Sequence, residues 1–136
     1  MSEGMERGLR LRLQRAGRQM ARQHQTLRPL AQALGAVSEP MSPAHFDRFT
    51  EALRAHFILE EDTVFPAVHG LHPETEADLE QLALDHDALR EELATLARHG
   101  TRVSTHAQEF LAHLRAHEAR EEALLRRALA EPKGAD

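Results

Sequence analysis

Residues 107–128 read AQEFLAHLRAHEAREEALLRRA, and this stretch decides the fold class. Its apolar residues recur every three or four positions, which is the spacing of one face of an amphipathic helix. That face contains Ala107, Phe110, Leu114, His117, Glu121, Leu124 and Ala128. No part of the sequence alternates apolar and polar residues over a useful length, so we expect no strands. The sequence therefore predicts an all-α protein.

Three further segments repeat this pattern, and turn-forming residues separate them. Ser42 and Pro43 are typical of a helix N-cap and a first helical residue. We expect Gly70 to end one helix and Pro73 to begin the next. The last break contains a helix-ending glycine and three candidate caps, which are Gly100, Thr101, Ser104 and Thr105.

Four long helices with short connections favour an antiparallel up-down-up-down four-helix bundle. The predicted helices cover residues 6–36, 43–69, 73–99 and 104–130. The 136 residues are the length of one domain, and we expect a single domain over 1–136. Pro29 and Pro66 lie inside predicted helices, where each removes a backbone hydrogen bond, so we expect kinks there.

Composition excludes several classes of protein. The chain is 41% hydrophobic and 29% charged, which is an ordinary globular balance, and without cysteine it can form no disulfide or thiolate metal site. No apolar run approaches the roughly 18 residues of a membrane span. Residues 1–18 are rich in arginine and lack an apolar core, so we expect no secretory signal and a cytoplasmic location away from membranes.

The helix predicted over 6–36 is basic, but the whole chain carries a net charge of −5. No aromatic residues alternate with its arginines, and no DNA-reading motif is present, so we expect no nucleic-acid partner. A solvated basic face is the favoured interpretation, and a contact between two copies is the alternative. The sequence leaves a monomer and a homodimer open.

Six polar residues interrupt the otherwise apolar faces of the four helices, and they are His24, His56, Glu60, His86, His117 and Glu121. Counted along the predicted helices, all four histidines lie roughly 20 Å from the same end of the bundle. Glu60 and Glu121 follow His56 and His117 by one turn on the same faces. The sequence therefore predicts one buried polar layer. Beyond Glu60, we expect the buried face of the helix predicted over 43–69 to continue to Thr63.

A metal centre satisfies this layer better than a network of hydrogen bonds does. Buried carboxylates are costly when they have no partner, and imidazole with carboxylate suits iron, manganese and zinc. Six such groups are more than one ion usually needs. They suit two ions bridged by Glu60 and Glu121, with His24 and His56 on one ion and the pair His86 and His117 on the other.

These residues resemble the hemerythrin-like (HHE cation-binding) family of non-haem di-iron four-helix bundles. The family pattern is a histidine, then H-x-x-x-E, then a histidine, then H-x-x-x-E, on four successive helices. It is matched in order by His24, His56 to Glu60, His86, and His117 to Glu121. The longer runs HFILEEDTVFP (56–66), DHDALREEL (85–93) and LRAHEAREE (114–122) are also similar to the family.

The resemblance also has departures. The oxygen-carrying hemerythrins have a second histidine four residues after the first on the third helix, where this chain has Arg90. Their fourth helix uses a histidine and an aspartate five residues apart, whereas His117 and Glu121 are four apart. His113 is a candidate replacement ligand, although a role beside the centre or at the surface is favoured. Arg90 is expected to reach solvent or to pair with Glu61, Glu91 or an anionic ligand. A solvated Glu61 is favoured, and a place beside the metal ligands is the alternative for it.

The resemblance implies that the protein binds or reacts with oxygen, nitric oxide or peroxide at a carboxylate-bridged pair of iron ions. Zinc or manganese in place of iron stays open, as does the question of whether the protein is an enzyme. The alternatives are sensing or storage of iron or oxygen without turnover, and a regulatory bundle in which the metal is only structural. Ferritin-like and zincin sites are set aside because the chain contains neither E-x-x-H nor H-E-x-x-H.

Overall fold

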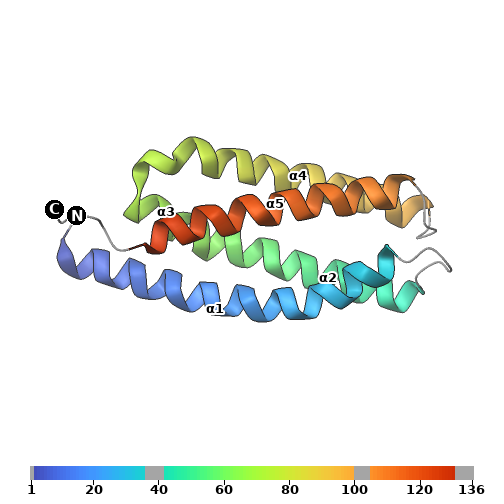
Figure 1. The fold of residues 1–136 in the computed structure, drawn as a ribbon, viewed down its shortest axis with the longest axis horizontal. Coiled ribbons are helices and arrows are strands. Elements are labelled where there is room, and N and C mark those ends of the chain that lie inside the picture. The colour runs from blue at the N-terminus through green and yellow to red at the C-terminus, as the bar shows by residue number, and fades with distance from the viewer. Residues whose placement is uncertain (1, 36–41, 100–104, 131–136) are drawn as a thin grey trace.

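The computed structural model describes residues 2–35, 42–99 and 105–130, and within these ranges all regular structure is helical. The elements are α1 (Glu3–Leu34), α2 (Pro43–Leu59), η1 (Glu60–Val64), α3 (Phe65–Leu71), η2 (Pro73–Thr75), α4 (Glu76–His99) and α5 (Thr105–Leu129). α2, η1 and α3 form one continuous rod, so the described residues form a bundle of four helical rods. Figure 1 shows that successive rods run in alternating directions. The predicted all-α four-helix bundle is confirmed.

Serine N-caps set the positions at which the first two rods begin. The Ser2 hydroxyl accepts a hydrogen bond from the Met5 N–H at 3.1 Å, so α1 begins three residues before the predicted start. The Ser42 hydroxyl accepts from the His45 N–H at 3.2 Å, and Pro43 is the first helical residue, as expected. Of the caps expected for the last helix, Thr105 is already helical, and Thr101 and Ser104 lie outside the described residues.

Gly70 does not end its helix, contrary to the prediction. α3 continues to Leu71, and His72 is its C-cap. A methyl group at Gly70 would lie 2.7 Å from Leu9 Cδ1 of α1, so Leu9 would have to move to make room. The glycine therefore serves close packing of α1 against α3 rather than a left-handed turn.

A π-helical turn interrupts the second rod at η1, next to one of the prolines. Pro66 has no N–H, and the preceding Phe65 N–H bonds to the Glu60 carbonyl five residues back instead of four. A π-helical turn contains more residues than an α-helical turn, so the residues after it are rotated relative to the regular α-helical pattern. Val64 is therefore buried and Thr63 is only half-buried, which corrects the predicted face. At Pro29, by contrast, α1 runs on without interruption.

Two apolar clusters fill the bundle on either side of the predicted polar layer. One contains all four buried phenylalanines and lies around Leu27, Leu34, Phe46, Phe49, Leu53, Phe57, Leu89, Leu93, Leu96, Ala107, Phe110, Leu111 and Leu114. The other is aliphatic and contains Leu13, Ala16, Met20, Val64, Ala67, Val68, Leu79, Leu82, Leu124 and Ala128. In every rod the layer residues follow one set and precede the other in sequence, except that Phe57 of the first cluster comes directly after His56. The polar layer therefore lies between two apolar cores.

The outer surface of the bundle is mostly polar, and its exposed large hydrophobic side chains are Met5, Leu11, Ile58 and Leu84. Most arginines of α1 are exposed in the single chain, and these include Arg7, Arg12, Arg15, Arg18 and Arg22. None of the described helices is both long enough and apolar enough to cross a membrane.

Candidate metal centre

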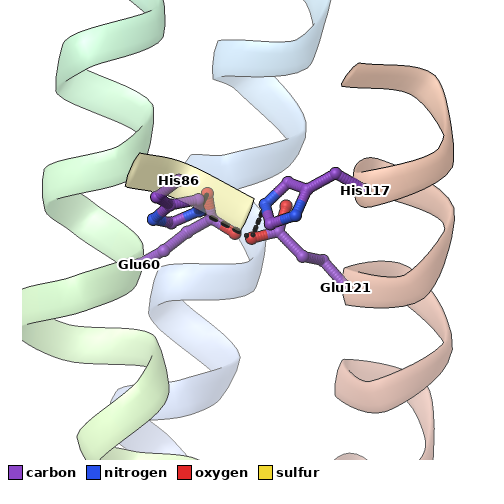
Figure 2. A group of neighbouring side chains, drawn as sticks. All are labelled: Glu60, His86, His117 and Glu121. Atoms are coloured by element: carbon purple, nitrogen blue, oxygen red, sulfur yellow. Dashed lines mark hydrogen bonds and ion pairs between the residues drawn. The ribbon is translucent and has the colours of Figure 1, made fainter. Parts of the chain in front are cut away.

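Four residues of the layer converge at the middle of the bundle, and they are Glu60, His86, His117 and Glu121 (Figure 2). Each offers one ligand atom, and these atoms all lie within 4.8 Å of one another. His117 Nε2 is 3.0 Å and His86 Nε2 is 3.3 Å from Glu121 Oε2. All four residues are buried. Such a group of imidazoles and carboxylates can hold a metal ion.

His24 and His56 extend this group toward α1. His56 Nε2 lies 3.3 Å from Glu60 Oε1, and His24 Nε2 lies 3.2 Å from His56 Nε2. His86 Nε2 approaches the same Glu60 oxygen from the other side at 3.5 Å. Glu60 Oε1 therefore stands between two imidazoles. The structure thus brings all six residues that the sequence singled out into one connected cluster.

Several polar atoms of the cluster are buried without a hydrogen-bond partner in the described part of the chain. They are Glu60 Oε1 and Oε2, His117 Nε2 and Glu121 Oε1. Leaving polar atoms of this kind without a partner costs free energy, more so for a carboxylate. A cation bound by these atoms would satisfy all of them at once. The donor set therefore fits a metal ion.

Burial also sets the protonation of the cluster. It lowers the pKa of His56 to about 3 and that of His117 to about 4, with a smaller effect of the neighbouring histidines. Both imidazoles are therefore neutral at physiological pH, and a neutral imidazole is the form that binds metals. Burial raises the pKa of Glu60 to about 7. A nearby cation would offset that effect by favouring the carboxylate.

Each fully buried histidine is oriented by a hydrogen bond at its other ring nitrogen. His86 Nδ1 lies 2.7 Å from Glu61 Oε2, and His117 Nδ1 lies 3.1 Å from Asp85 Oδ2. His56 Nδ1 lies 2.8 Å from the amide oxygen of Gln23. Because these oxygens only accept, each Nδ1 donates its proton and each Nε2 keeps a lone pair for the centre.

Two arginines hold the carboxylates that orient these histidines. Arg90 donates to Glu61 at 2.9 Å, and Arg120 donates to Asp85. Burial works to raise the pKa of Glu61, but the hydrogen bonds from Arg90 and His86 outweigh it and lower that pKa. The favoured expectation of a solvated Glu61 is therefore wrong, and the alternative of a place beside the ligands holds, because its carboxylate links His86 to Arg90. The pairing of Arg90 with Glu61 agrees with one of the partners considered for it.

Two phenylalanines fix the plane of His86. The Phe57 ring stacks on it at a centroid distance of 4.0 Å, and the Phe65 ring stacks at 5.5 Å. This contact limits rotation of the imidazole and excludes water from it.

The remaining histidines play no part in the cluster where their side chains are described. His113 Nδ1 bonds to Glu92 Oε2 at 2.7 Å, so His113 is placed beside the centre and not in it. His72 Nε2 bonds to the Ala128 carbonyl at 3.1 Å. The side chains of His45, His69 and His106 are exposed, and the side chain of His99 lies outside the described part of the structure.

Sequence reasoning missed Gln23 and Asp85. Each directly precedes a layer histidine, and each orients the layer histidine of the neighbouring rod rather than its own neighbour in sequence. A polar residue before each of His24 and His86 was the available signal.

Two spaces adjoin the cluster. A cavity of about 240 Å³ between α1 and α5 is lined by His24, Leu27, Arg28 and Glu118, among others. His24 is the only half-exposed member of the six, so this cavity gives access to the cluster from outside. A void of about 10 Å³ lies beside Glu60 and Glu121 among apolar side chains that include Met20 and Val64. It has about the volume that one water molecule needs.

Comparison with known proteins places this site in a family context. A family model described as the Hemerythrin HHE cation binding domain matches residues 16–129. This range includes all six cluster residues and Gln23, Glu61 and Asp85. Searches of curated proteins and of solved structures found no significant match.

Proposed function

The chain belongs to the hemerythrin HHE cation-binding family, and we propose that it holds two iron ions at the cluster and binds or reacts with oxygen, nitric oxide or peroxide there. His24 and His56 are the proposed ligands of one ion. His86 and His117 are the proposed ligands of the other. Glu60 and Glu121 are the proposed bridges.

The set of buried polar atoms without a partner carries this proposal. Four such atoms belong to Glu60, His117 and Glu121, and they lie between two apolar cores. Glu60 Oε1 also lies within 3.5 Å of a histidine from each proposed pair, which is the position expected of a bridge. A purely structural hydrogen-bond network would leave these atoms unsatisfied.

Iron bound at the cluster would supply redox chemistry and positions for a small ligand. The chain itself supplies orientation and a dry surrounding. Gln23, Asp85 and Glu61 hold the imidazoles with Nε2 turned inward. The void of about 10 Å³ beside Glu60 and Glu121 limits what fits there to very small molecules. The cavity at His24 is the proposed way in.

A single structural ion is the second candidate. Glu60, His86, His117 and Glu121 form a compact set of four donors, and zinc favours four ligands. In this case His24 and His56 would bond to each other as the structure has them.

Metal analysis combined with optical spectroscopy tests the proposal. The protein is loaded with ferrous iron without oxygen, passed through a desalting column, and analysed for bound iron. We expect two ions per chain and a new absorption band after exposure to oxygen, nitric oxide or peroxide.

The matched variants are Glu121→Ala, which removes a proposed bridge, and His106→Ala, which removes an exposed histidine. Glu121→Ala should lose most of the second ion, and His106→Ala should keep both. The proposal would be contradicted if the protein held one zinc ion per chain and its absorption spectrum did not change with oxygen, nitric oxide or peroxide. That result would support the structural candidate.

A further inference from the structure

A second cavity, of about 300 Å³, lies between α2 and α4 and is separate from the one at His24. Apolar side chains line most of it, among them Phe46, Leu53 and Leu93. Ala94 and Ala97 of α4 are exposed, and their small side chains leave the cavity open to solvent. A volume of about 300 Å³ is at the lower end of the range for small-molecule pockets.

Two arginines line the end of this cavity that lies nearer the metal centre. Arg54 of α2 is exposed, and no ion pair to it is found among the described residues. The Arg90 guanidinium lies 5.3 Å from the centroid of the Phe57 ring. No acidic residue lines the cavity. Because Arg90 is already paired with Glu61 and Asp87, Arg54 supplies the unpaired positive charge at this end. The opposite end, at Phe46 and Ala97, is apolar.

Thr50 also lines the cavity, between Phe46 and Arg54 on α2. Thr50 Oγ1 is buried and has no hydrogen-bond partner in the described part of the chain. Thr50 lies one helical turn from Arg54 on the same side of α2. A buried hydroxyl without a partner costs free energy, and rotation of the Thr50 side chain toward the cavity would let a bound ligand satisfy it.

We propose that this cavity binds a medium-chain carboxylate. Its head group would accept hydrogen bonds from Arg54, Arg90 and the Thr50 hydroxyl, since guanidinium groups suit carboxylate geometry. Its tail would run toward Phe46 and Ala97. The distance from Arg54 to Phe46 along α2 is about 12 Å, which suits a chain of roughly eight to ten carbons. The site does not depend on which metal the centre holds.

The position of the site connects it to the metal centre through one residue. Phe57 forms part of the cavity wall on one side and stacks on His86 on the other. A bound carboxylate would therefore lie one aromatic ring away from the centre, without touching any of the six cluster residues.

Calorimetric titration of the metal-loaded full chain with decanoate tests the proposal. We expect one molecule of decanoate to bind per chain. Shortening the chain to octanoate should weaken binding by up to about fourfold for each methylene removed. Decylamine should not bind, because its charge is opposite.

Three variants localise the binding. Ala94→Phe fills the cavity from an exposed position and should abolish binding. Arg54→Gln should weaken it about tenfold, which is the loss of one charged hydrogen bond. Arg48→Gln changes an exposed arginine of α2 outside the cavity and should have no effect. Far-UV circular dichroism checks that each variant folds.

Failure of decanoate to bind would overturn the proposal. Equal affinity in the wild type and in the folded Ala94→Phe and Arg54→Gln variants would overturn it too, because binding would then be elsewhere. Neither result would affect the proposed metal centre, whose iron content is measured separately.

Discussion

The two halves of the bundle contribute the same three ligand types to the centre but support them differently. His24, His56 and Glu60 of the N-terminal half recur 61 or 62 residues later as His86, His117 and Glu121 of the C-terminal half. Gln23 and Asp85 occupy matching positions, directly before the first histidine of each half. The halves therefore differ in the groups around the ligands more than in the ligands themselves.

The C-terminal pair of histidines has the stronger support. His86 and His117 each donate to a carboxylate, and each carboxylate is held by an arginine. In the N-terminal half His56 donates to the neutral amide of Gln23. A carboxylate partner makes an imidazole a better metal ligand than an amide does. We therefore expect the ion between His86 and His117 to be held more tightly.

The C-terminal half, whose histidines have the stronger support, also has the more deeply buried ligands. His86 is enclosed between two phenylalanine rings and is fully buried. His24 is half-buried and lines the cavity between α1 and α5. We therefore expect small molecules to reach the proposed weaker position first.

Removal of one histidine from each half should have the largest and most unequal effect. We expect His117→Ala to lose nearly all bound iron, because it removes a proposed ligand of the better-supported position and one polar neighbour each of Asp85 and Glu121. His24→Ala should keep the ion of the C-terminal half. Iron content after desalting measures both. If the two variants retained the same amount of iron, the expected difference in metal affinity between the two halves would be contradicted.

Exchange of the supporting groups tests the cause of that difference. Asp85→Asn should weaken binding of the tighter ion by about 10- to 100-fold, the usual cost of losing such a partner. Gln23→Glu gives His56 a carboxylate partner and should strengthen binding of the weaker ion. Competition with a chelator measures both affinities. If Gln23→Glu weakens the second ion instead, the carboxylate is not what distinguishes the halves.

The stability of the metal-free protein should depend on Glu60 in a pH-dependent way. Because burial raises the Glu60 pKa from 4.5 to about 7, its protonated form stabilises the fold below pH 4.5, and this contribution is lost as the pH rises through 7. Glu60→Gln should therefore raise the free energy of unfolding at pH 8 by about 1–2 kcal/mol and have little effect at pH 5.

Urea unfolding in the presence of a chelator measures this difference at the two pH values. The exposed Glu91→Gln is the control and should show no such dependence. A loss of stability at pH 8 in Glu60→Gln would contradict the assigned cause.

The smallest effect is expected from the outermost arginines. Arg90 and Arg120 are partly exposed, and such ion pairs contribute about 0.2–1 kcal/mol. Arg90→Gln and Arg120→Gln should therefore weaken metal binding by no more than about fivefold. Chelator competition at low and high salt checks this. A larger loss in Arg120→Gln would show that Asp85 depends on it.

The periodicity of the sequence was sufficient to predict the bundle and the six cluster residues. Each helix carries its own apolar face, so an intrusion such as His86 or Glu121 is visible within one segment. The helix boundaries and the role of Gly70 were less accessible. Gly70 depends on Leu9 of another helix, and no local pattern contains that contact.

The supporting residues could not be read from the sequence for the same reason. Gln23 and Asp85 lie beside the buried faces of their helices, and only the relative rotation of two rods brings them to His56 and His117. Glu61 follows the buried Glu60, and solvation was the favoured expectation for it. In the structure it is the second residue of the π-helical turn, and its carboxylate reaches His86 from there.

Titration of the metal-free protein with ferrous iron in the absence of oxygen tests the central claim most directly. We predict that two ions bind per chain in two calorimetric steps, the tighter one first, and that His24→Ala removes the second step alone. Binding of a single ion, or of none, would contradict the assignment of all six residues to one two-metal centre.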